Sequence, residues 1–283
     1  MTEQAQIVHG FFAVMVFILG GMIGSFLNVC VYRLPRGKSI VTPRSACPKC
    51  ESLIAWYDNI PVVSWLVLGA KCRRCGEPIS WQYPLVEALT ATLFLLVYWR
   101  FGWVAATPVY LLVSASLVLV TFVDLTVWEI PNEVTFPGIP LGLLCAIVAK
   151  FFPHTGLLVE SPLSAFGGML LGGGVLYLLD KAALIFLKKP GMGFGDVKLL
   201  AMLGAFFGWQ GVIFVMIVAS FLGSGIGVTL LVISRLRGEE KEAHYLPFGP
   251  YLALGGIIHM LIGEQAIALY LGAFTPSGTM MLQ

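Results

Sequence analysis

Charged side chains are scarce in this chain of 283 residues: Asp, Glu, Lys and Arg together make up only 11% of it. An average soluble domain has about 25% charged and roughly 45–50% apolar residues, whereas 58% of this chain is apolar and its mean hydropathy is +0.89. Too few charges remain to cover the surface of a soluble enzyme, and disorder is excluded for the same reason. The net charge of +2 also excludes nucleic acid as a partner.

Apolar runs of about twenty residues recur along the sequence, which is the length a helix needs to cross ~30 Å of hydrocarbon. A membrane barrel would instead alternate apolar and polar residues in short segments. We therefore predict an all-α polytopic membrane protein surrounded by membrane lipid. About eight spans are expected, at residues 7–30, 83–99, 104–124, 136–150, 163–187, 197–210, 211–234 and 248–273. The sixth span is short and Gly208–Gly211 joins it to the seventh, so a count of seven stays open. No internal repeat is evident by inspection.

Basic residues are unevenly distributed between the two sides that eight alternating spans define. Of the 17 Lys and Arg residues, all but Arg100 and Lys150 fall in loops on one side, at 31–82, 125–135, 181–198 and 235–247. Positive residues stay on the cytoplasmic side, so we predict that these loops are cytoplasmic and that both termini are periplasmic. The first nine residues contain no Lys or Arg, unlike a cleavable signal peptide, so the first span is expected to remain.

Four cysteines form two CxxC pairs in the sizeable polar segment at about 31–82: Cys47 with Cys50, and Cys72 with Cys75. Two such pairs are the ligand pattern of a tetrathiolate zinc site. A loop of about fifty residues has little core of its own, and a metal can supply its folding free energy. Because four thiolates fill the coordination shell, we predict structural Zn²⁺. Two disulfides are the alternative, which fails if the loop is cytoplasmic.

Two aspartates border apolar spans on the predicted cytoplasmic side. Asp124 ends the third span, and Asp196 follows Gly193-Phe194-Gly195 at the start of the sixth. Carboxylates near hydrocarbon are costly and therefore indicate function. Two of them at equal depth could share a proton, so that one activates water and the other polarises a peptide carbonyl, as in aspartic proteases. Gly193 and Gly195 would let the backbone approach an extended peptide closely.

Other interpretations of these acidic residues stay open. Asp196 could be only the N-cap of a helix, and Asp124 only the polar end of a span. A phosphate-binding glycine turn at Gly191–Asp196 should follow a strand, which is not expected here. Glu87, near the start of the second span, either interacts with the helix dipole or lines a site that faces the loop. No GxSxG, HExxH or P-loop lysine motif competes with aspartyl chemistry.

These motifs resemble those of the type IV prepilin peptidase family, within the GxGD class of membrane aspartyl proteases. The resemblance covers most of the chain. It is carried by Gly24–Val29 with Tyr32–Pro35, the two CxxC pairs, Asp124 with Ile130–Asn132, Gly193–Lys198 and Pro247–Pro250.

The resemblance implies a bacterial inner-membrane peptidase that removes a short basic leader from prepilins and pseudopilins on the cytoplasmic side. It implies Asp124 and Asp196 as catalytic residues, and N-methylation of the new N-terminus, often Phe, with S-adenosylmethionine. No methyl-donor residues carry over. We predict three regions: a first transmembrane helix at 1–30, a zinc-binding loop associated with methylation at 31–82, and a peptidase core at 83–283. A membrane transporter and a non-catalytic, zinc-stabilised secretion scaffold are the alternatives.

Overall fold

The computed structural model describes residues 3–188, 193–236 and 246–274. Regular structure in these ranges is helical, apart from two isolated β-bridges in the polar loop. Seven helical segments are long and apolar enough to cross a membrane, which confirms a polytopic helical membrane protein. The chain divides into two compact units, Met1–Val134 with His154–Leu157, and Thr135–Pro153 with Leu158–Gln283. Three of the basic residues used to predict orientation, Lys189, Arg237 and Lys241, lie outside the described residues.

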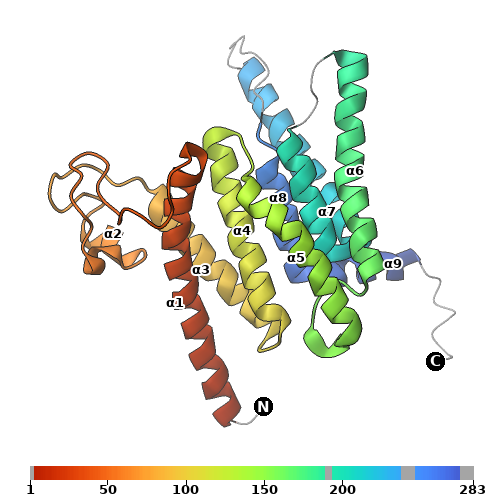
Figure 1. Ribbon diagram of the computed structural model, residues 1–283, viewed down its shortest axis with the longest axis horizontal. Coiled ribbons are helices and arrows are strands. Elements are labelled where there is room, and N and C mark those ends of the chain that lie inside the picture. The colour runs from red at the N-terminus through yellow and green to blue at the C-terminus, as the bar shows by residue number, and fades with distance from the viewer. Residues whose placement is uncertain (1–2, 189–192, 237–245, 275–283) are drawn as a thin grey trace. The chain divides into compact units, whose positions relative to one another are not determined.

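The first unit contains three membrane helices and the polar loop. Its helices are α1 (Glu3–Arg33), α3 (Gln82–Phe101) and α4 (Ala106–Val127), and the loop contains η2 (Trp56–Asn59) and α2 (Val63–Val67). In Figure 1 the C-terminal ends of α1 and α4 lie on the same side of this unit. The loop is attached there, because it follows α1 directly through η1 (Leu34–Arg36).

Close packing of α1 on α3 depends on two glycines one turn apart. A Cβ atom at Gly20 would lie 2.7 Å from the Cα of Ala91, and one at Gly24 would lie 2.7 Å from the Cα of Glu87. Small residues at this spacing let membrane helices approach closely. The side-chain amide of Asn28 extends the contact by donating to the backbone carbonyl of Tyr83 (3.0 Å).

The second unit contains the remaining helices. These are most of α5 (Asn132–Phe151), then α6 (Pro162–Leu187), α7 (Phe194–Leu236), α8 (Gly249–Ile258) and α9 (Glu264–Phe274). The last two belong to one apolar segment with a π-helical turn, His259–Gly263, between them. At this turn α9 leads away from α8 at an angle (Figure 1).

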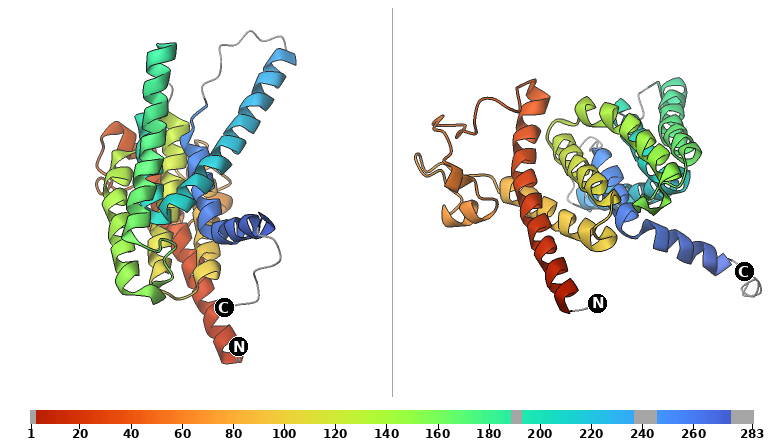
Figure 2. Two further views of the ribbon diagram at one scale, coloured as in Figure 1. Left: turned by 90° about the vertical axis from the view of Figure 1, so that its right-hand side faces the viewer. Right: turned by 60° about the horizontal axis from the view of Figure 1, so that its bottom comes forward.

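The longest helix, α7, has 43 residues and is broken at Gly208, where φ is 72° and ψ is −177°. Unbroken, it would be ~65 Å long, about twice the ~30 Å of hydrocarbon. Instead its second arm returns toward the side on which the first arm begins (Figure 2). The two arms correspond to the predicted sixth and seventh spans, but the turn comes at Gly208, earlier than the predicted boundary after residue 210.

The first arm of α7 forms the core of the second unit. From Asp196 to Gly208 every residue except Lys198 is buried. Glycines of α6 make room for it: Gly168 faces Gly204, and a Cβ at Gly172 would lie 2.6 Å from the backbone carbonyl oxygen of Leu200. This packing fixes the position of the helix whose first turn carries Asp196.

Candidate active site and metal centre

Asp124 lies in the last turn of α4. Only 5% of the residue is exposed, although the next two residues, Leu125 and Thr126, are exposed. Its backbone carbonyl accepts a hydrogen bond from the N–H of Trp128 (2.9 Å), which adopts a left-handed conformation and ends the helix. The carboxyl group is therefore enclosed by protein at the end of an apolar helix, which shields it from hydrocarbon.

Asp196 lies in the first turn of α7 and is 8% exposed. It is the third residue of the helix, and its N–H donates to the carbonyl of Gly193 (3.1 Å). An N-cap residue precedes the helix, so this position does not fit the N-cap interpretation. A Cβ at Gly193 would lie 3.4 Å from Oδ2 of Asp196. A Cβ at Gly193 would therefore make ordinary van der Waals contact with the carboxylate.

The two aspartates belong to different compact units, Asp124 to the first and Asp196 to the second. Each is buried at the end of a membrane helix, which is the environment that an aspartyl dyad needs. Their pairing stays a prediction. The phosphate-binding alternative involves Gly191 and Met192, which lie outside the described residues; the element before them, α6, is a helix and not a strand.

The four loop cysteines lie together. Their Sγ atoms are all within 4.8 Å of one another, and those of Cys47 and Cys75 are 3.7 Å apart. With metal–sulfur bonds of ~2.3 Å, a tetrahedral site places its sulfurs ~3.8 Å apart. None of the cysteines forms a disulfide, so the two-disulfide alternative does not describe this loop. The cluster could hold a metal ion.

The two CxxC pairs are carried by two copies of one backbone motif, 25 residues apart. In the first copy, the N–H of Cys47 donates to the carbonyl of Ser52, and the N–H of Ile54 donates to the carbonyl of Ser45. In the second copy, the N–H of Cys72 donates to the carbonyl of Glu77, and the N–H of Ile79 donates to the carbonyl of Ala70. The bridges Ala46–Leu53 and Lys71–Pro78 also correspond. The absence of an internal repeat, expected from inspection, is therefore wrong for this loop. The signal was C-x-x-C-x-x-x-I-x-W, present at residues 47–56 and 72–81.

Local hydrogen bonds favour the thiolate form of two cysteines in this cluster. Hydrogen bonds from Ser52 lower the pKa of the Cys50 thiol to about 6, and the backbone N–H groups of Cys75 and Arg74 lower the pKa of Cys72. Metals bind the deprotonated sulfur. The pKa of Cys75 is instead raised to about 12: the backbone N–H of Glu77 lowers it, but desolvation and the neighbouring thiols outweigh this effect. The polar groups of the loop therefore favour the thiolate form at Cys50 and Cys72.

Two ion pairs join distant parts of the loop. Lys49 of the first CxxC pair bonds Glu77, which follows the second pair. Arg73 contacts both carboxylate oxygens of Asp58, at 2.8 and 2.6 Å, and these hydrogen bonds lower the pKa of Asp58. The first pair holds together the two segments that a shared metal would join, and the second holds the second CxxC segment to η2.

Glu87 has a role that sequence reasoning left open. Its Oε2 accepts a hydrogen bond from the backbone N–H of Val62 (2.7 Å), and it also accepts from the hydroxyl of Ser25. Val62 has a φ of 62°, an unfavourable conformation for a β-branched residue. The carboxylate therefore faces the loop and ties it to α1 and α3.

Comparisons with known proteins agree with the motif analysis. Residues 18–101 match the family model of the bacterial peptidase A24 N-terminal domain, and residues 110–228 match that of the type IV leader peptidase family. No solved structure matches the chain.

Three relatives share the name prepilin leader peptidase/N-methyltransferase. The Myxococcus xanthus protein is 40% identical over 82% of this chain and 67% of its own length. The Pseudomonas aeruginosa protein is 36% identical over 92% of this chain and 93% of its own. The Aeromonas hydrophila protein is 36% identical over 97% of this chain and 100% of its own. The chain therefore belongs to the type IV leader peptidase family.

Proposed function

We propose that this protein cuts prepilins and pseudopilins at the cytoplasmic face of the bacterial inner membrane, with Asp124 and Asp196 as the catalytic pair. The reaction class follows from the family: a prepilin leader peptidase that also N-methylates its product. The observation that carries the assignment of residues is that each aspartate is buried in an end turn of an apolar helix, 5% and 8% exposed.

The membrane sides of the two aspartates are inferred from the order of the spans. Asp124 is near the end of α4, Asp196 is near the start of α7, and two spans, α5 and α6, lie between them. Two crossings return a chain to the same face. The basic loops identify this face as cytoplasmic, which also places both termini in the periplasm. A prepilin with a basic leader and an apolar helix presents its scissile bond at this boundary.

Helix dipoles distinguish the roles of the two carboxyl groups. Negative charge is stabilised at a helix N-terminus and destabilised at a C-terminus. Asp196 lies in a first turn and Asp124 in a last turn. We therefore assign Asp196 as the ionised base that takes a proton from the attacking water, and Asp124 as the protonated partner that donates to the scissile carbonyl oxygen.

Hydrolysis then proceeds without a covalent enzyme intermediate. Water oxygen bonds to the carbonyl carbon while its proton passes to Asp196. Collapse of the tetrahedral intermediate breaks the C–N bond. The leaving nitrogen takes the proton held by Asp196 and becomes the new pilin α-amine, while a hydroxyl of the intermediate returns a proton to Asp124 as the C=O bond re-forms. When bound, S-adenosylmethionine would supply the methyl group that this amine, in its neutral form, takes up in exchange for a proton.

The four cysteines are assigned to structural Zn²⁺. Four thiolates from two short turns are the donor set and geometry that this ion prefers. When bound, zinc would join the two copies of the motif and supply folding free energy to a loop that has little core. It would take no part in peptide hydrolysis, because four sulfurs leave no open coordination position.

Single Asp→Asn variants test the dyad. A candidate prepilin is co-expressed with wild type, Asp124→Asn, Asp196→Asn or Asp180→Asn, and the mass and N-terminus of the pilin are determined. Asp180 is the matched control, because it is an acidic residue near the end of α6 on the same predicted side. We expect full cleavage by Asp180→Asn and none by Asp196→Asn. Residual cleavage is expected for Asp124→Asn, whose amide can still donate to the carbonyl.

Two results would contradict this proposal. Cleavage at the wild-type rate by Asp196→Asn, in a variant that inserts normally, would remove the aspartyl mechanism and favour a scaffold role. More residual cleavage by Asp196→Asn than by Asp124→Asn would reverse the assignment of base and acid.

A further inference from the structure

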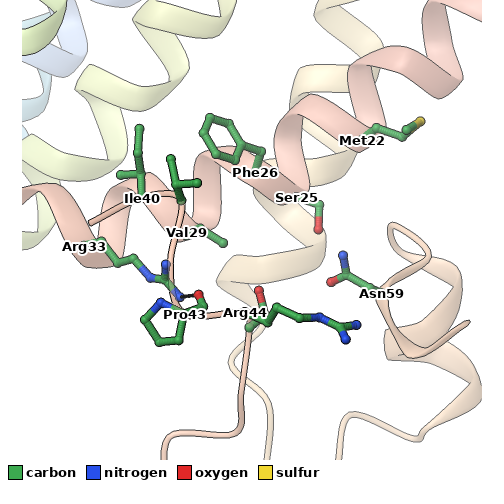
Figure 3. A pocket seen from close by; sticks show the side chains of 11 residues that line it. Met22, Ser25, Phe26, Val29, Arg33, Ile40, Pro43, Arg44 and Asn59 are labelled. Atoms are coloured by element: carbon green, nitrogen blue, oxygen red, sulfur yellow. Dashed lines mark hydrogen bonds between the residues drawn. The ribbon is translucent and has the colours of Figure 1, made fainter. Parts of the chain in front are cut away.

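A cavity of about 210 Å³ lies beside the C-terminal end of α1 in the first unit (Figure 3). Its walls come from α1, from residues 40–45 of the loop, and from Asn59 in η2. Apolar side chains, including Phe26, Val29 and Ile40, form part of the lining. The cavity therefore combines an apolar helix surface with polar groups of the metal-binding loop.

Two arginines at the wall of the cavity that residues 40–45 form have different roles: one holds this segment in place, and the other is available to bind a ligand. Arg33 donates to the backbone carbonyls of Ser39 (2.9 Å) and Pro43 (2.7 Å), and so holds the segment that closes the cavity. Arg44 also lines the cavity but has no hydrogen-bond or ion-pair partner within the described part of the chain. Its guanidinium is free to bind an anion.

Ser25 and Asn59 supply the complementary groups. In Figure 3 their polar ends point toward each other, and the side chain of Arg44 extends to the same region. The hydroxyl of Ser25 donates its proton to Glu87, so its oxygen can accept a hydrogen bond from a ligand. Glu87 also binds the N–H of Val62, three residues after Asn59. The buried carboxylate thereby positions both groups without itself lining the cavity.

We infer that this cavity binds the amino-acid end of S-adenosylmethionine, with Arg44 on its carboxylate and Ser25 and Asn59 accepting from its ammonium. The inference rests on the proposed methyltransferase function. A cation beside two hydrogen-bond acceptors matches a zwitterion better than a simple anion. Whole ligand pockets usually measure about 300–1,000 Å³, so a cavity of 210 Å³ accommodates one end of the donor and leaves the nucleoside toward its open side.

The position of the cavity suits this use. It lies at the C-terminal end of α1, and the C-terminal end of α4, which carries Asp124, is on the same side of the unit (Figure 1). The pilin amine produced by cleavage would therefore appear at the membrane face on which the donor is held.

The test compares Arg44→Gln with Arg36→Gln in the full-length, metal-loaded protein. Arg36 is a matched control: it lies one turn beyond Arg33 and stacks on Tyr32, outside the cavity. Equilibrium dialysis with radiolabelled S-adenosylmethionine measures Kd, and coupled assays measure the methylation KM and the rate of prepilin cleavage. We expect Arg44→Gln to raise Kd and KM for the donor by about tenfold or more, as loss of a charge-assisted hydrogen bond should. Cleavage should change less than twofold, and Arg44→Lys should recover part of the affinity.

Three outcomes would overturn the inference. One is wild-type donor Kd and KM in Arg44→Gln. Another is an equal loss in Arg36→Gln, which would indicate a general effect of surface charge. The third is an Arg44→Gln defect that appears in vesicles containing phosphatidylglycerol but not in phosphatidylcholine alone, which would identify a lipid headgroup site. Failure of the proposed function is separately visible, because wild type would then neither cleave nor methylate, while dialysis would still report on the cavity.

Discussion

Replacement of Gly172 by Ala tests whether close packing of α6 positions the helix that carries Asp196. The new Cβ would lie 2.6 Å from the carbonyl oxygen of Leu200, 3.0 Å from its carbonyl carbon and 2.8 Å from a methyl group of Val212. Two of these neighbours are backbone atoms of α7, which cannot rotate away. Leu200 is one helical turn after Asp196, so movement at this contact displaces the carboxylate directly.

The size of the effect follows from the distances. Carbon–oxygen contacts between helices normally lie at about 3.3–3.6 Å, so the two helices must separate by roughly 0.7 Å or more at this point. Overpacking of this kind typically costs about 1–3 kcal/mol, and each kcal/mol shifts Tm by about 2–4 °C in a protein of roughly this size. We therefore expect Gly172→Ala to lower Tm by several degrees and to reduce the rate of prepilin cleavage.

Gly174→Ala is the matched control on the same helix. A Cβ at Gly174 would meet no atom within 4 Å, so the same substitution should leave Tm and cleavage close to wild type. Thermal unfolding in detergent and single-turnover cleavage provide the two measurements. Equal Tm values for the two variants would refute the close-packing argument, and a lower Tm with unchanged cleavage would refute the link to Asp196.

Three further predictions concern the loop. Cys47→Ser should remove bound zinc, measured by elemental analysis, and should reduce methylation at least about tenfold because the loop loses folding free energy that the metal supplies. Cys145→Ser changes a buried cysteine in a membrane helix and should do neither. Zinc retained in Cys47→Ser would exclude the four cysteines as the metal site. Glu87→Ala should speed proteolysis near Val62, since leaving the Val62 N–H unpaired costs about 1–3 kcal/mol. Glu87→Gln keeps an acceptor oxygen for this N–H and should protect the loop from proteolysis. Equal proteolysis rates for the two variants would contradict the hydrogen bond between Val62 and Glu87. Arg73→Gln should raise the carboxyl titration midpoint of Asp58, followed by NMR. Because Arg73 lowers the pKa of Asp58, the pair stabilises the loop at neutral pH, and this contribution is lost as pH falls through that pKa. An unchanged titration midpoint of Asp58 in Arg73→Gln would show that the pair does not form.

Features that depend on neighbouring residues were predictable from the sequence. Apolar runs placed the membrane helices because each helix satisfies its own backbone hydrogen bonds, so its existence depends mainly on its length and apolarity. The cysteine cluster was predictable because each CxxC pair places two sulfurs on one turn. The four sulfurs then need only two turns to meet, and they lie within 4.8 Å of one another.

Features that depend on contacts between distant residues were not predictable. The turn in α7 was expected somewhere in Gly208–Gly211, and only the backbone shows that Gly208 alone leaves the helical conformation. The hydrogen bond from Val62 to Glu87 joins residues 25 positions apart, and no periodicity reports such a pair. The repeated motif is different, because its C-x-x-C-x-x-x-I-x-W pattern is present in the sequence and the backbone hydrogen bonds show that its two copies fold alike.

Glu87 connects the packed pair of membrane helices α1 and α3 to the loop that carries the four cysteines. On one side it packs where Gly24 lets α1 approach α3, and on the other it binds the loop at Val62. Displacement of the loop would therefore separate Asn59 from Ser25 and open the cavity, while α1 and α3 remained packed through Gly20. Loss of the metal or of Glu87 should for this reason impair methylation before it impairs cleavage. The proposed catalytic aspartates lie in membrane helices, whereas the proposed donor cavity needs the loop in place, so the two activities should respond to different substitutions.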